Sequence, residues 1–374
     1  MFDTDSLASV QEQIRSQTAA QAGLFVEILR DARALGAEVR AIQPRSATSI
    51  SLVASDGGNN RIEFNPFLLQ LIRVVDSYGD ELFRDVITPS LDVRRLGDRH
   101  LDEKTPLGRL MTDLGVGSLP ELSPMLPVQP KNAGWVLTYR DICEWAILYD
   151  LIRYRDFGTD TLIVRDGLLR SKIFQRDLFV QMYRLLRARI EELAVKRRRD
   201  VFLVGLAKHS KILQRYAMAI TVAGVFPPGT PCFAPVPLDI QRKVYQWEEY
   251  VRPVDTGEPS FGEDPKFNIG RMYLVRFGRQ SGDPIWTVDL LESQQGRAQE
   301  IFGCLLADAL DGFPIPFYPN CLQQADHHAQ VVDFDLDILR DTLADAVRAL
   351  VDPASRPALD ALQLATDVAR RRYE

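Results

Sequence analysis

The sequence predicts an α/β protein, with a mixed sheet, a helical insertion and long helices near both ends. Three β-rich runs follow one another between residues 48 and 75, which favours an antiparallel meander. Two later runs, over 161–164 and 201–206, are continuously apolar, as in strands that are covered on both faces. Segments of helical periodicity separate and flank these runs.

The stretch Ser51–Phe64 (SLVASDGGNNRIEF) holds the first candidate site residue. A run over 48–55 is followed by Asp56–Asn60 (DGGNN) and by a second run over 60–65. This pattern predicts two strands of a hairpin whose turn is the Gly/Asn segment. Asp56 would end the first strand, where a carboxylate can bind a divalent cation through oxygen. The alternative is an Asx-type residue that only caps the turn.

Helical periodicity predicts most of the remaining elements. The first helix, over 5–36, contains a break near Gln21-Ala22-Gly23. A third strand is expected over 67–75. Further helices are expected over 138–155, 172–199, 293–310, 321–351 and 356–373, and an antiparallel strand pair over 270–277 and 284–290.

These elements suggest a division of the chain into three segments. The expected parts are an N-terminal helical segment over 1–45, a main domain over 46–335, and a C-terminal helical segment over 336–374. The main domain would carry a helical insertion at about 80–156 and an irregular, proline-rich insertion at about 225–268.

Composition limits the classes of protein that are compatible with the chain. With 374 residues and 46% hydrophobic side chains, the chain can bury one large core or two smaller ones. The net charge of −6 gives no global basic field for nucleic acid, although a local groove can still be basic. The four cysteines form no CxxC pair, which favours free thiols in a reducing cytoplasm. No apolar run approaches the roughly 20 residues of a membrane helix, and the polar N-terminus is unlike a signal peptide.

Acidic and basic residues stand at the ends of the predicted strands. Asp166 follows the run 161–164, as Asp56 follows the first strand, and Lys208 stands just past 201–206. In open α/β sheets, ligands gather outside strand ends, so these side chains could converge on one point. Glu144, on the helix over 138–155, could supply a third oxygen ligand. Acids around Mg²⁺ or Mn²⁺, with a lysine, suit phosphodiester hydrolysis.

Four short motifs resemble the NurA nucleases of DNA-end processing. They are Ser55–Gly58 (SDGG), Arg165–Leu168 (RDGL), Val204–Ser210 (VGLAKHS) and Tyr318–Asp326 (YPNCLQQAD). Their order and approximate spacing are similar to the family pattern over residues 48 to about 335. The first motif reads Asp-Gly-Gly where the family more often has Asp-Gly-Ser.

The resemblance implies an RNase H-like fold with a helical insertion. It also implies a Mn²⁺-dependent (or Mg²⁺-dependent) nuclease, a homodimer that forms a DNA channel, and a HerA-type hexameric ATPase translocase as partner. Carried over to this sequence, the metal ligands are Asp56, Glu144 and Asp166, and Lys208 is the cation beside the phosphate. Asp326 stands where some relatives carry histidine, so the fourth ligand is Asp326, His327 or His328.

Basic residues near these motifs are candidates for nucleic-acid contacts. Lys208 and Lys211 lie beside the expected site, and Arg165, Arg170 and Lys172 follow the strand that carries Asp166. The cationic run 196–199 is either a further DNA contact or a solvated helix end. Each candidate has a structural alternative, since Glu144 could be an exposed helix carboxylate and the two lysines could solvate a loop.

Two other functions remain open at this stage. The Asp-Gly-Gly-Asn-Asn hairpin also resembles the first phosphate loop of ATP-binding sugar-kinase and actin-like phosphotransferases. Those proteins need a second phosphate hairpin and a glycine-rich adenosine motif, for which Gly205–Lys208 is a poor substitute. The other alternative is a catalytically inactive scaffold for a motor protein, against which both strand-end aspartates and the lysine argue.

Overall fold

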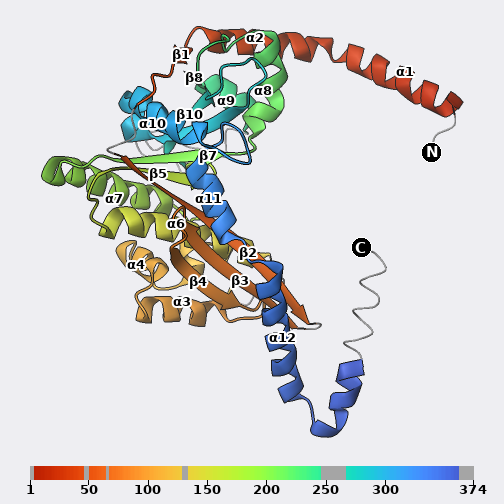
Figure 1. The fold of residues 1–374 in the computed structure, drawn as a ribbon, viewed down its shortest axis with the longest axis vertical. Coiled ribbons are helices and arrows are strands. Elements are labelled where there is room, and N and C mark those ends of the chain that lie inside the picture. Colours follow the sequence, from red (N-terminus) through yellow and green to blue (C-terminus); the bar gives the residue numbers. More distant parts are fainter. Residues whose placement is uncertain (1–3, 46–49, 65–66, 129–133, 246–266, 362–374) are drawn as a thin grey trace.

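Nine strands form one sheet in the computed structural model of the protein, which describes residues 4–45, 50–64, 67–128, 134–245 and 267–361. For residues 50–61 and 63–64 it describes the backbone alone. The strands are β1 (Arg40–Ala41), β2 (Ile50–Phe64), β3 (Phe67–Asp76), β4 (Glu81–Ile87), β5 (Asp160–Asp166), β7 (Val201–Ala207), β8 (Cys232–Pro235), β10 (Gly270–Arg276) and β11 (Ile285–Leu291). Their order across the sheet is β1-β8-β10-β11-β7-β5-β2-β3-β4 (Figure 1). A separate two-stranded sheet pairs β6 (Arg170–Ser171) with β9 (Phe267–Asn268).

The sheet is mixed, as the sequence predicts. Strands β2, β3 and β4 form an antiparallel meander, whereas β2, β5 and β7 run parallel to one another. The expected antiparallel pair of β10 and β11 is also confirmed, and β11 joins the sheet antiparallel to β7. The parallel strands therefore lie in the middle of the sheet.

The predicted hairpin turn at Asp56–Asn60 is wrong. These residues lie inside the continuous strand β2, and each of them pairs with a residue of β3, including Gly57 with Val74 and Gly58 with Arg73. The pairing continues to Phe64 and Phe67. Backbone hydrogen bonding to the long apolar strand β3 overrides the local turn preference of the glycines and asparagines. The meander is completed by β4, which lies in the region predicted to be helical.

Twelve α-helices are described beside the sheet, and several begin at a side-chain cap. The side chains of Asp92, Thr105 and Ser210 accept hydrogen bonds from Arg94 N, Gly108 N and Leu213 N, which fixes the starts of three helices. The helices are α1 (Thr4–Ala20), α2 (Ala22–Gly36), α3 (Val93–Asp102), α4 (Pro106–Asp113), α5 (Leu119–Leu122), α6 (Trp135–Tyr154), α7 (Leu178–Glu192), α8 (Lys211–Val222), α9 (Leu238–Val244), α10 (Ala298–Leu310), α11 (Asn320–Ala329) and α12 (Asp333–Leu350).

The helix predictions are correct in outline and wrong at several boundaries. The break between α1 and α2 at Gln21 is confirmed. The helix expected over 172–199 begins only at Leu178 and ends in a π-helical turn, Leu193–Arg197. The single helix expected over 321–351 is two helices, α11 and α12. Of the helix expected over 356–373, residues 356–361 are helical and the remainder lies outside the described residues.

The predicted irregular insertion at 225–268 contains β8 and α9, and its residues 246–266 lie outside the described part of the chain. The division into 1–45, 46–335 and 336–374 stays a prediction. Within the described ranges, every helix is too short or too polar to span a lipid bilayer.

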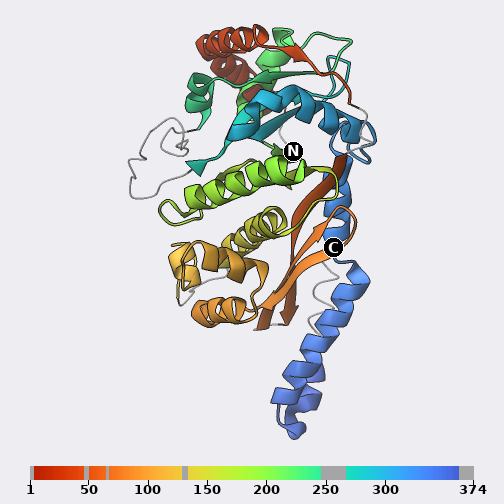
Figure 2. The ribbon, with the colours of Figure 1, turned by 90° about the vertical axis from the view of Figure 1, so that its left-hand side faces the viewer.

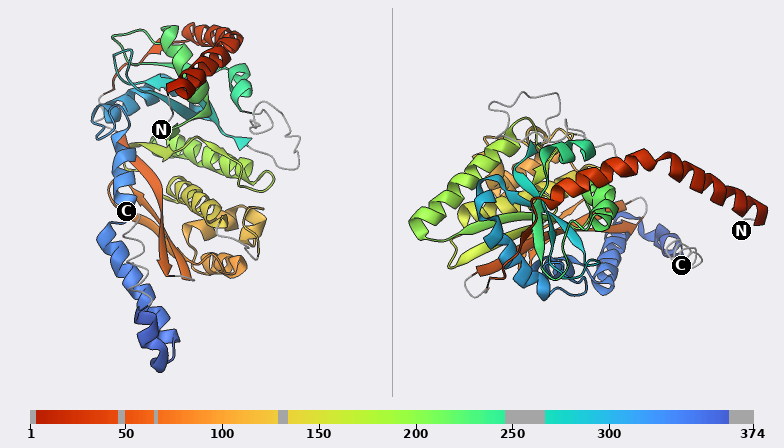
Figure 3. Two further views of the ribbon diagram at one scale, coloured as in Figure 1. Left: turned by 90° about the vertical axis from the view of Figure 1, so that its right-hand side faces the viewer. Right: turned by 90° about the horizontal axis from the view of Figure 1, so that it is seen from above.

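Helices cover both faces of the central strands, so the prediction of fully buried strands is confirmed. On one face, Ile163 and Leu203 pack with α6 and α7, and on the other face Leu162 and Val204 pack with α10 and α11. This alternation follows from the two-residue period of a strand. Figure 2 shows α6 and α7 stacked beside the sheet, with α11 on its other side. Helix α12 packs on Ile62 of β2 and extends away from the body, as α1 does (Figure 3).

The helical insertion encloses a polar network around His100, which is 1% exposed. Its Nε2 lies 2.6 Å from Tyr139 Oη, which donates to Asp85 Oδ2 at 2.7 Å, and its Nδ1 lies 2.9 Å from Thr105 Oγ1. All these partners are satisfied when Nε2 carries the proton and Nδ1 accepts from Thr105. Burial lowers the pKa of His100 from 6.5 to about 4, so the imidazole is neutral at pH 7.

Mild acid should destabilise the wild-type protein more than a His100→Gln variant. Because the folded-state pKa is depressed to about 4, the unfolded chain binds more protons between pH 4 and 6.5, and stability falls as the pH falls through this window. Between pH 7 and pH 5 the wild-type free energy of unfolding should drop by about 2 kcal/mol more than that of the variant. Urea unfolding at both pH values measures the difference, with the exposed His327→Gln as control. Parallel pH profiles for wild type and His100→Gln would contradict the prediction.

Candidate active site

The parallel pairing of β2 and β5 brings two aspartates to the same edge of the sheet. The last residues paired in this ladder are Ser55 and Arg165. The next residues of the two strands are therefore Asp56 and Asp166, which occupy neighbouring register positions where the parallel pairing ends. On the other side of β5, Asp166 pairs with Leu206 of β7. The two aspartates thus occupy neighbouring positions, although Asp56 lies inside β2 and does not end that strand as the sequence predicted.

Lys208 follows β7 and lies between two carboxylates. Its Nζ is 3.2 Å from Asp166 Oδ2 and 3.3 Å from Asp326 Oδ2, which α11 carries to this edge. Burial lowers the pKa of Lys208, but the charges of Asp166 and Asp326 together raise it by more. The pKa of Lys208 therefore lies above its ordinary value of 10.5. Lys208 therefore stays charged at neutral pH, with 29% of its side chain exposed. The three side chains form a partly open, acidic group with a central cation.

Tyr318 is a member of this cluster to which the sequence assigned no role. It is fully buried, its Oη lies 3.5 Å from Asp166 Oδ1, and the Lys208 ammonium lies 5.4 Å from its ring centroid. The ring also packs on Trp286, with 4.9 Å between centroids. Tyr318 thus contacts both Asp166 and Lys208. The signal was present, because Tyr318 opens the last of the four motifs.

The loop after Asp166 is held by close packing and by a buried ion pair. Gly205 of β7 lies so near this loop that a Cβ would stand 2.5 Å from Gly167 O, which leaves room for glycine alone. Arg170 and Asp289 are 2.9 Å apart, and Asp289 Oδ2 also accepts from Leu169 N at 3.2 Å. Removing one partner of such a buried pair costs about 3–5 kcal/mol. Arg170 therefore anchors this loop in the interior, where it is not accessible to a phosphate.

Glu144 lies on the opposite face of the sheet from Asp166. Consecutive strand residues point to opposite faces, so Arg165 turns toward α6 while Asp166 turns toward α11. Glu144 Oε2 is 3.8 Å from Arg165 Nη2, and the Arg165 guanidinium stacks on Trp145, 4.5 Å from the ring centroid. Arg165 is closer still to Asp141, at 2.7 Å. The carboxylates that were expected to converge thus form two groups, one on each side of the strand ends.

The remaining predicted residues lie at varied distances from this cluster. His327 is exposed on α11, one residue past Asp326, and the backbone carbonyl of His328 accepts from Arg73 Nη1 at 2.8 Å. Lys172 is exposed, and so is Lys211, whose ammonium lies 5.8 Å from the Tyr245 ring centroid. Of the residues considered for the fourth position, Asp326 is the one that contacts Lys208.

Metal-binding capacity rests on the carboxylates of this edge. Among the side chains that the structure describes, no three acidic, histidine or cysteine residues lie close enough to hold a metal, and Asp56 is not one of those side chains. A carboxylate offers about four lone-pair positions. The contacts of Asp166 with Lys208 and Tyr318 therefore leave positions for a hard cation, and a quarter of its side chain is exposed.

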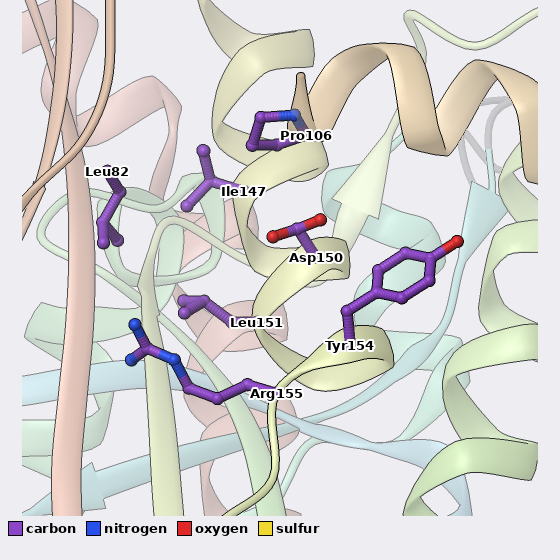
Figure 4. Close-up of a pocket in the computed structure, with 7 residues that line it drawn as sticks. All are labelled: Leu82, Pro106, Ile147, Asp150, Leu151, Tyr154 and Arg155. Carbon is purple, nitrogen blue, oxygen red and sulfur yellow. The ribbon is translucent and has the colours of Figure 1, made fainter. Parts of the chain in front are cut away.

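A surface hollow in the helical insertion is not part of the cluster. It has a volume of about 280 Å³ and is lined by Leu82, Pro106, Ile147, Asp150, Leu151, Tyr154 and Arg155 (Figure 4). Asp150 is already paired with Arg109, with 2.5 Å between Oδ1 and Nε. None of the predicted site residues lines this hollow, so the chemistry at the strand ends does not depend on it.

Comparison with known proteins gives matches to solved structures alone. No protein-family model matches the chain, and no curated protein matches it. The NurA nuclease from Sulfolobus solfataricus aligns at 12% identity over 94% of this chain and 99% of its own, with a TM-score of 0.42. The chain is similar to NurA nucleases. A NurA structure with manganese aligns at 12% identity over 91% and 99%, with a TM-score of 0.41, and one bound to dAMP and manganese at 11% identity over 96% and 100%, also with a TM-score of 0.41.

These alignments with NurA structures span nearly the whole chain. The likeness is distant, at TM-scores near 0.4.

Proposed function

We propose that the protein is a divalent-metal-dependent deoxyribonuclease that hydrolyses phosphodiester bonds in DNA-end processing or repair. The observation that carries this proposal is the adjacency of Asp56 and Asp166 in the parallel register, with Lys208 directly after the next strand, β7. The strand order β4-β3-β2-β5-β7, with an antiparallel meander followed by parallel strands, supports an RNase H-like arrangement. The alternative of an actin-like phosphate loop loses its basis, because Asp56–Asn60 lie within a strand.

Asp56 and Asp166 would hold Mn²⁺ or Mg²⁺, because hard cations prefer carboxylate oxygens. A bound ion supplies Lewis-acid chemistry, activating water and neutralising phosphate charge. Glu144, on the α6 side of the sheet, and Asp326, on the α11 side, are the further candidate metal ligands. Tyr318 and Lys208 orient the Asp166 carboxylate, since each contacts one of its two oxygens.

Lys208 would neutralise the charge that grows on the scissile phosphate. Its ammonium is paired with Asp166 and Asp326 and is still partly exposed. Because it is already charged, it can bind an anionic ligand directly. DNA affinity would come from local contacts to phosphates, because the net charge of −6 gives no long-range attraction. Lys211 and Lys172 are exposed and lie three and six residues after Lys208 and Asp166.

We further infer a homodimer that works with a HerA-type hexameric ATPase translocase in the cytoplasm. The inference rests on the sequence motifs and on two helices, α1 and α12, that extend from the body (Figure 3). Both helices carry exposed apolar side chains, among them Leu7, Ile14, Ile338 and Leu350. The four cysteines are buried free thiols, which is compatible with a reducing compartment.

Replacing Asp56 or Asp166 should abolish cleavage of end-labelled linear DNA. Asp56→Asn and Asp166→Asn should each lower the rate at saturating Mn²⁺ by about 100-fold or more, because one metal ligand is worth several kcal/mol in the transition state. EDTA should stop the wild-type reaction, and Mn²⁺ should raise the melting temperature of the wild type more than that of Asp166→Asn. Asp337→Asn, an exposed acid on α12, serves as control. Near wild-type rates in either site variant would refute a shared metal site.

Lys208→Ala should lower kcat much more than DNA affinity, by about 100-fold or more, because a cation at the scissile phosphate acts mainly in the transition state. Neutralising 196–199 should instead raise KM and spare kcat, because this run precedes β7 and lies at the other end of that strand, roughly 20 Å from Lys208. Lys211→Ala should reduce the steepness of the plot of log K for DNA binding against log salt concentration by about one unit. Steady-state kinetics and salt titrations measure these effects. Loss of affinity with unchanged kcat in Lys208→Ala would make Lys208 an ordinary backbone contact.

The extended helices should carry self-association or translocase binding. Ile14→Glu places a charge on the apolar stripe of α1 and should weaken the assembly, whereas Ser16→Glu, on another side of the same helix, should not. Light scattering at micromolar concentration and co-sedimentation with a HerA-type ATPase provide the readouts. A wild-type monomer that binds no such ATPase would remove this inference.

A further inference from the structure

The loop between α10 and α11 presents apolar side chains to solvent. Phe313 is 79% exposed and Ile315 is 39% exposed, and Leu310, at the end of α10, is also exposed. Large apolar side chains gain free energy when they are buried, so a cluster of them at a loop tip indicates a binding surface. The helices that flank this loop pack on the face of the sheet opposite to α6 and α7 (Figure 2).

Hydrogen bonds from Gln323 and Trp286 hold the backbone of this loop, although Phe313 is exposed. The side chain of Gln323 on α11 accepts from Ile315 N at 2.8 Å and donates to Ile315 O and Tyr318 O at 3.0 and 2.9 Å. Trp286 Nε1 donates to Phe317 O at 2.5 Å. These bonds hold the segment of the loop that follows Phe313. A side chain on such a frame loses little conformational entropy when a ligand covers it.

The same loop is continuous with the proposed active site. Tyr318, which contacts Asp166 and Lys208, ends the loop, and Gly312 folds back onto it. A Cβ on Gly312 would stand 2.2 Å from Tyr318 O, so the backbone next to Phe313 touches the backbone of Tyr318. Phe313 is one residue, about 3.8 Å of chain, beyond this contact. The loop that carries Phe313 therefore ends at Tyr318, a residue that contacts both Asp166 and Lys208.

We propose that Phe313 is a stacking platform for an unpaired nucleobase of the DNA strand that the active site cleaves. The proposal rests on the proposed nuclease function and specifies how its substrate is held. A phosphate backbone at Lys208 carries its bases within reach of the loop, and every base has a flat apolar face that stacks on an aromatic ring. A base can stack on Phe313 only when it has left the duplex, so the site takes a single strand or a frayed end.

The test compares strands that have and lack bases. A short single-stranded DNA with a fluorescein label is prepared with natural bases or with abasic tetrahydrofuran residues at the first six positions of the unlabelled end. Dissociation constants are measured by anisotropy in EDTA, which prevents cleavage. Wild-type protein should bind the natural strand about 10-fold more tightly than the abasic strand, as one stacked base provides. Phe313→Ala should remove this difference, and Phe313→Trp should keep it.

A second exposed phenylalanine provides the control, and cleavage is measured separately from binding. Phe67→Ala, an exposed phenylalanine at the start of β3, should behave as wild type. An unchanged ratio of the two dissociation constants in Phe313→Ala overturns the proposal. A change of oligomeric state in that variant with the ratio unchanged also overturns it, and makes the loop a contact between copies of this chain. Cleavage with Mn²⁺ is scored separately: base-dependent binding through Phe313 without any cleavage contradicts the nuclease proposal and leaves the stacking site standing.

Discussion

The parallel pairing of β2, β5 and β7 is the constraint on which the rest of the structure depends. Their ladder brings Asp56, Asp166 and Lys208 to one edge, although these residues are far apart in sequence. Both faces of β5 are buried, so a slip of one residue would exchange the side chains that pack in its two cores and disturb the packing of both. Packing on two sides thus sets the positions of the charged residues at the strand ends.

Two kinds of ion pair serve different purposes around this edge. Arg170 and Asp289 are almost completely buried, and their pair anchors the loop after Asp166. Lys208 is shared by Asp166 and Asp326 and remains partly exposed, so its pairing is weaker and open to exchange with an incoming anion. A positive charge that is already held in position, and that water can still reach, is suited to binding a phosphate.

The candidate site lies where the parallel pairing of the central strands ends, and not in the hollow of the helical insertion. Helix α11 supplies Asp326, and the loop before it supplies Tyr318, so this part of the chain completes the edge that β5 and β7 begin. On the α6 side, Glu144 and Arg165 form a second polar group.

The sequence by itself determined that the fold is a mixed α/β fold and which charged residues follow its central strands. The apolar runs at 161–164 and 201–206 predicted buried parallel strands, and Asp166 and Lys208 were found because they follow those runs directly. Arg170 was misread as a surface cation, since the partner that buries it, Asp289, lies on a strand far along the chain.

Only the tertiary structure decided how these pieces meet. The Gly/Asn stretch became part of a strand because β3 supplied its hydrogen-bond partners, which no local preference could reveal. Asp326 was brought to Lys208, and Glu144 to the other face, by the packing of α11 and α6 on opposite sides of the sheet. Local patterns report the period and polarity of one segment, whereas contacts between distant segments depend on which faces pack together, and that is a property of the whole chain.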